Sequence, residues 1–249
     1  MIYRRAARYL GSVSLLLIIL VAGTTAQQTA STFTDNFHST TLDSAHWRQA
    51  STRAIGTVKP TAQGLEVSLK FGNQPPFFAK NLWLACRIRG DFDARVSYRL
   101  LEWPRSNGVR LGLGVLPKAL PLGSTNLLGM NGQGRGLSNA ITERIDALQG
   151  EIAGQPGGGD FHVGDFNGRF TQFIPTGNPT GKLRLARVGT TFTAYYLQGK
   201  DWSPLGIWSV VNTEDEWLAI QLWSTHLIRD QVKVRLENFS ITAAGLDCP

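Results

Sequence analysis

The stretch that decides the fold is Gly181–Trp208, GKLRLARVGTTFTAYYLQGKDWSPLGIW. Its apolar residues recur at every second position, which is the spacing of a half-buried strand. One face would carry Leu183, Leu185, Phe192, Ala194 and Tyr196, and the other Arg184, Thr193 and Tyr195. Gly189 and Gly199 mark turns between the strands. Because a hairpin with one apolar face needs a second sheet to cover it, the stretch predicts an extracellular all-β sandwich.

The same alternation occurs along most of the chain. It is found in Gly64–Phe71, Asp91–Leu101, Val109–Val115, Leu218–Leu222 and Val232–Ile241. Helical periodicity is weak, and Ser138–Leu148 is the one segment whose spacing fits either a helix or a strand. Two Gly-rich segments, Pro117–Gly136 and Ala153–Gly168, are predicted to be long loops, either functional or simply tolerated. No domain boundary or internal repeat is evident.

The N-terminal residues have the composition of a secretory signal. Three arginines precede an apolar run, Ser12–Ala22, and small residues end at Ala26. The run is shorter than the ~20 residues that span a bilayer, so we expect residues 1–26 to be a cleaved signal peptide. An uncleaved N-terminal membrane anchor is the alternative. The expected location is secreted, either extracellular or periplasmic, with no membrane span in the mature chain.

Charge and cysteine content narrow the function further. Without the three leader arginines the chain has 22 basic and 18 acidic residues, and the basic ones are scattered. Nucleic-acid readers concentrate basic residues in a patch or a known module, so we expect no nucleic-acid partner. The two cysteines, Cys86 and Cys248, could pair in an oxidising compartment, or Cys86 could be a buried thiol and Cys248 an incidental one.

Three segments follow one another in an order that resembles a known superfamily. They are FTDNFHSTTLDSAHW at Phe33–Trp47, GDFDARVSY at Gly90–Tyr98, and Lys182–Gly206 followed by VKVRLENFSI at Val232–Ile241. Together they resemble the concanavalin A-like (laminin-G-like jelly-roll) superfamily, and especially secreted concanavalin-like domains of unknown function. The resemblance implies an antiparallel two-sheet jelly roll over residues 33–243. A short lead at 27–32 and a tail at 244–249 would flank it.

The resemblance also implies a strand pairing and a core. The first and last strands of such folds lie side by side, so Phe33–Phe37 would pair near Glu237–Ile241. The large side chains expected in the core are Phe33, Phe37, Trp47, Phe92, Phe192, Tyr196, Trp202 and Phe239.

One sheet of a jelly roll is concave on its outer face, and outward residues there meet ligands. The expected outward residues are Arg110, Gly112 and Gly114 on one strand and Trp217, Ala219, Gln221 and Trp223 on another. Glycines would let a sugar ring approach the backbone. If strand order follows the resemblance, Arg99 and Trp103 flank the same region. The candidate binding residues are therefore Arg99, Trp103, Arg110, Gly112, Gln221 and Trp223, with core packing as the alternative role for the tryptophans.

An enzyme on this fold would carry paired carboxylates on one face of a strand, as in Glu-x-Asp-x-x-Glu. The nearest approach is Glu143, Asp146 and Glu151, whose odd spacing sends strand residues to opposite faces. These acids, like Glu214–Glu216, are expected to be solvated. No Gly-x-Ser-x-Gly motif occurs. The sequence therefore favours a non-catalytic carbohydrate-binding module over a divergent glycoside hydrolase or polysaccharide lyase, and a cell-surface structural or interaction domain is a third possibility.

A metal site has weaker support. Asp160, Asp165 and Asn167 form an oxygen-rich group in a Gly-rich segment, which is a candidate calcium site. They do not match an EF-hand loop, and we expect no cofactor to be required. The partner expected is a carbohydrate or a glycan-coated surface.

Overall fold

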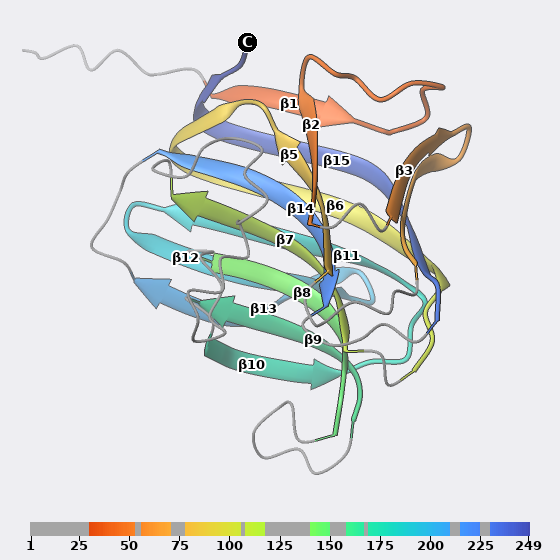
Figure 1. The fold of residues 1–249 in the computed structure, drawn as a ribbon. Helices are drawn as coiled ribbons and strands as arrows, with labels where there is room; N and C mark the ends of the chain where they lie inside the picture. Colours follow the sequence, from red (N-terminus) through yellow and green to blue (C-terminus); the bar gives the residue numbers. More distant parts are fainter. Residues whose placement is uncertain are drawn as a thin grey trace, which may run out of the picture.

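The computed structural model describes residues 30–52, 56–70, 78–105, 108–117, 140–149, 158–166, 169–209, 215–224 and 230–249. Their regular elements are strands (Figure 1). The strands are β1 (Ser31–Asp35), β2 (Trp47–Thr52), β3 (Gly56–Thr61), β4 (Gly64–Leu69), β5 (Phe78–Leu84), β6 (Arg87–Glu102), β7 (Val109–Pro117), β8 (Ala140–Ala147), β9 (Gly159–Phe166), β10 (Arg169–Pro175), β11 (Thr180–Val188), β12 (Thr191–Gln198), β13 (Asp201–Ser209), β14 (Glu216–Ser224) and β15 (Val232–Asp247). The predicted leader, residues 1–26, lies outside the described residues. The described residues contain no helix suited to crossing a membrane.

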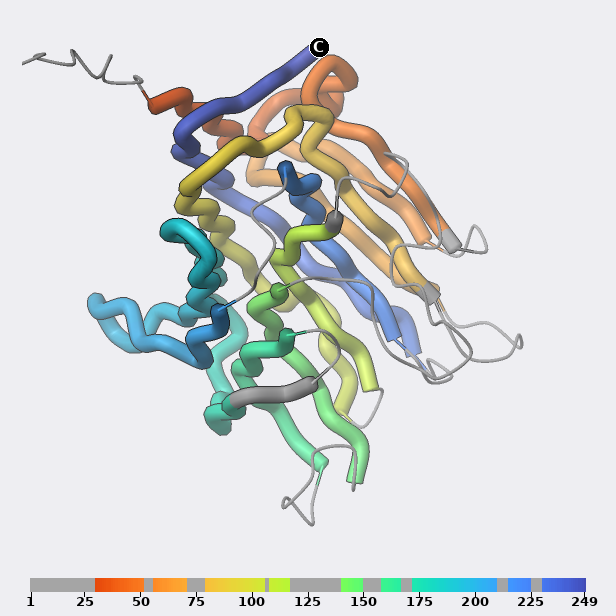
Figure 2. Tube along the Cα trace, turned by 90° about the vertical axis from the view of Figure 1, so that its left-hand side faces the viewer, coloured from red at the N-terminus to blue at the C-terminus, as the bar shows by residue number. Residues whose placement is uncertain are grey.

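The strands are arranged as two antiparallel layers, which confirms the predicted jelly-roll sandwich. The front sheet has the order β2-β5-β14-β7-β8-β9-β10. The back sheet has the order β13-β12-β11-β6-β15, and β1 and β4 pair with the far edge of β15. The layers meet where Glu216 of β14 pairs with Ile88 of β6. Figure 2 shows the front sheet on the right and the back sheet on the left.

The hairpin that decides the fold forms as its pattern predicts. Leu183, Leu185, Phe192, Ala194 and Tyr196 are buried between the sheets. β11 and β12 pair directly, with Leu185 opposite Ala194. The turns on either side of β12 contain Gly189 and Gly199 with φ of 56° and 64°, a left-handed backbone that glycine adopts without steric cost. Local sequence therefore sets both the register and the buried face.

The first and last strands lie side by side, as predicted. Phe33 of β1 pairs with Ile241 of β15, and Asp35 pairs with Phe239. The ring of Trp47 packs edge-on against Phe239 with centroids 5.0 Å apart. β15 continues to Asp247, so the sandwich extends past the predicted limit at residue 243.

A disulfide joins Cys86 to Cys248 across a sequence separation of 162 residues. Cys86 is fully buried in the main core, directly before β6 begins. The bond therefore fixes the end of the last strand to the turn between β5 and β6.

Two local predictions are wrong, and one ambiguous segment is a strand. The segment of ambiguous periodicity, Ser138–Leu148, contains the strand β8, and the predicted loop Ala153–Gly168 contains β9. Both strands are buried on both faces, so their polar residues hide the period-two signal. Trp202 lies on the outer face of the back sheet and is only partly buried, because β13 pairs it with Leu197, on the side of β12 facing away from the core.

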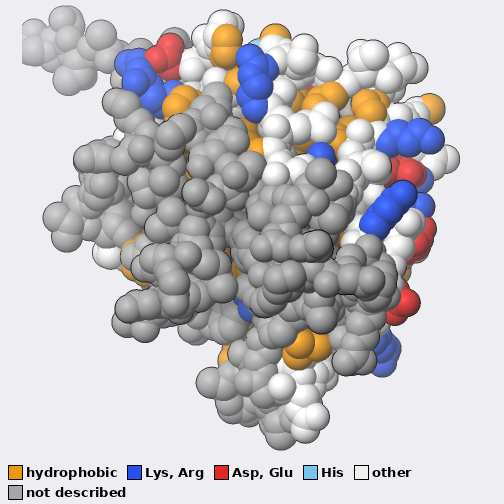
Figure 3. Space-filling view, viewed as in Figure 1, with side chains coloured by type: hydrophobic (Ala, Val, Ile, Leu, Met, Phe, Trp, Pro, Cys, Tyr) orange, Lys and Arg blue, Asp and Glu red, His pale blue; other side chains and the backbone are white. Residues whose placement is uncertain are grey.

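Acidic and basic side chains are interspersed along the right-hand edge of the front view (Figure 3). Ion pairs also join neighbouring strands of the back sheet. Lys233 Nζ lies 2.6 Å from Glu102 Oε1, and Arg235 Nη2 lies 3.0 Å from Glu66 Oε1. The surface charge of these strands is therefore mixed in sign and locally paired.

Candidate functional site on the front sheet

Four side-by-side positions form a row across the outer face of the front sheet. Gln221 of β14 pairs with Asn81 of β5 on one side and with Gly112 of β7 on the other, and Gly112 pairs with Glu143 of β8. The residues that flank Gln221, Ile220 and Leu222, point into the core, so Gln221 points outward. We call Asn81, Gln221, Gly112 and Glu143 the polar row.

The two amides at the start of this row lack hydrogen-bond partners. Asn81 and Gln221 are both 0% exposed. Within the described part of the chain, neither the nitrogen nor the oxygen of either side chain has a partner. A buried amide left without a partner costs about 1–3 kcal/mol, and most buried polar groups are therefore satisfied. Two adjacent unsatisfied amides are thus a costly feature at the centre of the sheet.

Beside the row, three side chains hold one another in place. Trp223 donates its indole N–H to Glu143 Oε1 at 3.0 Å. Arg110 Nη1 lies 3.6 Å from Glu143 Oε2, and its guanidinium lies 4.7 Å from the centre of the Trp223 ring. Arg110 and Trp223 are direct register partners on β7 and β14. Arg110 and the Trp223 N–H therefore both offset the charge of the Glu143 carboxylate, and all three side chains are buried.

Aromatic surface lies on the other side of the row. Trp83, two residues along β5 from Asn81, is 0% exposed and belongs to a small cluster with Ala50, Leu116 and Ala219, against which Trp217 packs. The indole N–H groups of Trp83 and Trp217 have no hydrogen-bond partner in the part of the chain that the structure describes. This part of the face combines apolar surface with unused donors.

The structure brings together four predicted binding residues, Arg110, Gly112, Gln221 and Trp223, but as a buried group and not as an open surface. The expected space above the glycines is filled, because a Cβ on Gly112 would lie 2.6 Å from Cδ1 of Ile141. Sequence reasoning missed Asn81, and it predicted that Glu143 would be solvated. Nothing in the apolar run around Asn81 indicates that β5 lies next to β14.

Arg99 and Trp103 do not join this site. Arg99 lies on β6 in the back sheet, opposite Thr180 and Arg235, and its side chain is exposed near Glu237. Trp103 directly follows β6, and its indole N–H donates to Asp160 Oδ1 at 2.9 Å. The prediction that they flank the same region is wrong because β6 belongs to the opposite layer.

The predicted calcium ligands do not converge either. Asp160 and Asp165 lie on opposite faces of β9, since five residues separate them along an extended strand. Asp160 is instead held by Trp103 and by Arg144, whose Nη2 lies 3.1 Å from Asp160 Oδ2. Asn167 lies outside the described residues.

The carboxylates considered for catalysis are also separated. Glu143 faces outward from the front sheet. Asp146, three residues along β8, faces inward, and both are buried where solvated acids were expected. Glu216 is buried as well, and its Oε1 lies 3.7 Å from Nη1 of Arg187. Glu151 and Glu214 lie outside the described residues.

The comparisons with known proteins identify the fold. No protein-family model and no curated protein sequence matches the chain. Peanut lectin, solved with a 9mer peptide, matches with a TM-score of 0.60 and 15% identity, over 88% of this chain and 100% of the lectin. Winged bean acidic lectin complexed with methyl-α-D-galactose matches with a TM-score of 0.54 and 13% identity, over 87% and 100%. The exoplasmic/lumenal domain of VIP36, in a Ca²⁺/Man3GlcNAc-bound form, matches with a TM-score of 0.52 and 10% identity, over 78% and 82%. The chain therefore has the concanavalin A-like jelly-roll fold found in lectins.

Proposed function

We propose that this protein is a non-catalytic carbohydrate-binding module whose sugar site is the polar row of the front sheet. The observation that carries the proposal is the pair of buried amides, Asn81 and Gln221, which have no hydrogen-bond partner among the described residues. A sugar hydroxyl both donates and accepts hydrogen bonds, and so does a primary amide. Because both amides are 0% exposed, a sugar reaches them only after the outer face opens, and a hydroxyl pair placed there would satisfy both.

The surroundings of the amides support a sugar over a purely apolar ligand. Trp83 and Trp217 offer aromatic surface and indole N–H groups, and aromatic rings of this kind combine apolar contact with a polar donor. Arg110 and Glu143 supply a charge-compensated wall on the other side. Binding sites in proteins commonly combine apolar lining with a few well-placed polar groups. Two proteins of the same fold, winged bean lectin and VIP36, hold sugars in their solved structures, which raises the plausibility of a sugar here.

We also propose that the protein works outside the cytoplasm, as a secreted extracellular or periplasmic protein. The Cys86–Cys248 disulfide supports this, because disulfides persist mainly in oxidising compartments. Fractionation of the native protein tests it, and recovery in the cytoplasmic fraction with both cysteines reduced would contradict it.

The sugar site is tested with a glycan array, followed by calorimetric titration of the sugars that bind. Gln221→Met replaces the amide with an apolar chain of similar length, and we expect it to weaken sugar binding at least tenfold. Gln63→Met makes the same chemical change at an exposed position in the β3–β4 turn and serves as the matched control. It should leave affinity unchanged within a factor of two.

Two results would contradict the proposal. One is an array on which the wild-type protein binds no glycan. The other is equal sugar affinity for wild type and Gln221→Met, since the bound sugar would then not use the amide.

A further inference from the structure

A shallow trough crosses the outer face of the back sheet, on the side of the sandwich opposite the polar row. It consists of two adjoining cavities of about 500 and 510 Å³. The cavities share the lining residues Ser97, Lys182, Leu197, Gly199 and Asn238. These residues come from β6, β11, β12, the turn after β12, and β15. We call this feature the back-sheet trough.

The trough exists because the regular sheet is interrupted on both sides of it, at β15 and at the turn after β12. At one end β15 has a bulge between Glu237 and Ser240, with Asn238 at a φ of 48°. At the other end the chain turns through Gly199 with a φ of 64°. Between them, Ser97, which has a short side chain, lies opposite Lys182 in the strand register. Bulges commonly redirect side chains next to functional surfaces.

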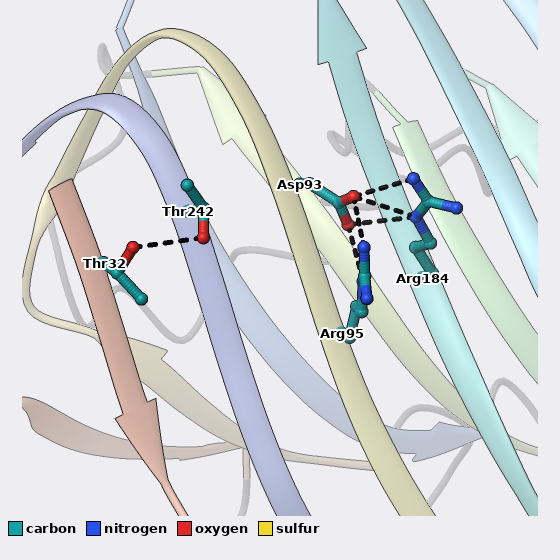
Figure 4. Close-up of polar contacts among 5 residues, drawn as sticks. All are labelled: Thr32, Asp93, Arg95, Arg184 and Thr242. Carbon is teal, nitrogen blue, oxygen red and sulfur yellow. Dashed lines mark hydrogen bonds and ion pairs between the residues drawn. The ribbon is translucent and has the colours of Figure 1, made fainter. Parts of the chain in front are cut away.

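One wall of the trough is formed by Trp202, which two arginines support. The guanidinium groups of Arg184 and Arg95 lie 5.5 and 5.8 Å from the centre of its ring. Asp93 lies between these arginines, with its carboxylate 2.7 Å from a nitrogen of each (Figure 4). Although burial opposes ionisation, hydrogen bonds from Arg95 and Arg184 lower the pKa of Asp93. The wall is thus a fixed and partly charge-compensated structure.

The trough itself has a positive charge excess. Its lining contains the basic residues Arg95, Arg99, Lys182 and Lys200, and one acid, Glu237. Arg95 is paired with Asp93, and Arg99 lies 3.9 Å from Glu237. Lys182 and Lys200 are exposed, and no acidic partner for either is found in the described part of the chain. Two ammonium groups are therefore available to an anion from solution.

We propose that the back-sheet trough binds an acidic polysaccharide, that is, a sugar chain bearing carboxylate or sulfate groups. Lys182 and Lys200 pair with the anionic groups, and Trp202 packs against the apolar face of a sugar ring. Ser97 and Asn238 are within the same trough to hydrogen-bond hydroxyls. A nucleic-acid strand fits less well, because such sites use several stacking aromatics along a basic groove. The described lining of this trough has one partly exposed ring, Trp202, and its other aromatic, Tyr98, is buried. The site is separate from the polar row and does not depend on it.

The test measures binding of the full chain to polygalacturonate, dextran sulfate and neutral dextran at low and moderate salt. Polygalacturonate reports carboxylate recognition, dextran sulfate reports sulfate recognition, and dextran reports the sugar backbone alone. We expect at least one acidic polymer to bind, dextran not to bind, and the Lys182→Gln/Lys200→Gln variant to bind at least tenfold more weakly. Trp202→Ala should also weaken binding several-fold.

The matched control is Lys59→Gln/Lys70→Gln, which removes the same charge from two exposed positions on and beside the β3–β4 hairpin. We expect it to bind like the wild type within a factor of two. Equal weakening of both double variants would show that binding follows net charge alone and would overturn the proposal. It would also be overturned if neither acidic polymer bound, or if a single-stranded oligonucleotide bound more tightly than both.

Discussion

At the scale of single residues, burial gives several polar groups roles that their sequence context does not reveal. His162, on the inward face of β9, is 4% exposed, and its ring stacks on Tyr196 with centroids 4.8 Å apart. Burial, together with the nearby positive charge of Arg144, lowers the pKa of His162 to about 3. The folded protein therefore holds this imidazole neutral, because a charge there would lie among buried side chains.

This residue should make the protein less stable in acid. The unfolded chain binds a proton at His162 near the ordinary pKa of about 6.5, whereas the folded chain resists it down to about 3. The contribution is therefore present in full above pH 6.5 and is lost as the pH falls below that value, by up to about 1.4 kcal/mol per pH unit. Denaturant unfolding between pH 7 and 4 tests this.

His162→Phe should flatten that part of the pH dependence, since phenylalanine does not titrate and retains the ring contact with Tyr196. His38→Gln, at an exposed position, is the control and should leave the curve unchanged. A His162→Phe protein with the same pH dependence as wild type would contradict the assignment.

At the scale of strands, the clearest constraint is the close approach of β7 and β8. A Cβ on Gly112 would lie 2.6 Å from Ile141 Cδ1. We expect Gly112→Ala to destabilise the fold by about 1–3 kcal/mol through overpacking. Adding Ile141→Ala should recover part of that loss, so the double variant would be more stable than the sum of the two single effects predicts. Strict additivity in a denaturant-unfolding cycle would show that Ile141 does not occupy this space.

Strands with a regular apolar alternation were predictable from the sequence, and β8 and β9, whose buried residues are largely polar or charged, were not. The alternation in β11 and β12 indicates the core residues because Arg184 and Tyr195 lie on the outer face. In β8, Glu143 and Arg144 are adjacent and both buried, one beside Arg110 and the other beside Asp160. These buried positions are stabilised by ion pairs and not by apolar side chains. The alternation of apolar and polar residues that marks a strand is therefore absent from the sequence of β8.

The candidate site was only half predictable for a related reason. Alternation within β7 and β14 places Arg110, Gln221 and Trp223 on one face. The contributions of Asn81 and Glu143 depend on which strands become neighbours, and β5 and β8 are far apart in sequence. Because the sequence does not reveal which strands become neighbours, it also led us to expect Arg99 beside this site, whereas Arg99 lies in the back sheet.

At the scale of the whole molecule, the Cys86–Cys248 disulfide closes most of the sandwich into one loop. The chain-entropy model gives a stabilisation of up to about 5 kcal/mol for a loop of this length, and measured values are commonly 2–4. Cys248→Ala should therefore unfold at clearly lower denaturant concentration than wild type while leaving the buried Cys86 in place. A reducing agent should destabilise wild type and have no effect on the variant. Identical unfolding of wild type in oxidising and reducing buffer would contradict the role of the bond.

The proposed sugar site requires that the two unsatisfied amides are retained for a ligand and not for folding. The most direct test is the free energy of unfolding of Asn81→Leu and Gln221→Met, measured by denaturant titration without sugar. We predict that both variants are as stable as wild type or more stable, because each removes a buried polar group that has no partner. A loss of more than about 1 kcal/mol in both variants would mean that the amides already make stabilising hydrogen bonds in the folded protein, and it would contradict the claim.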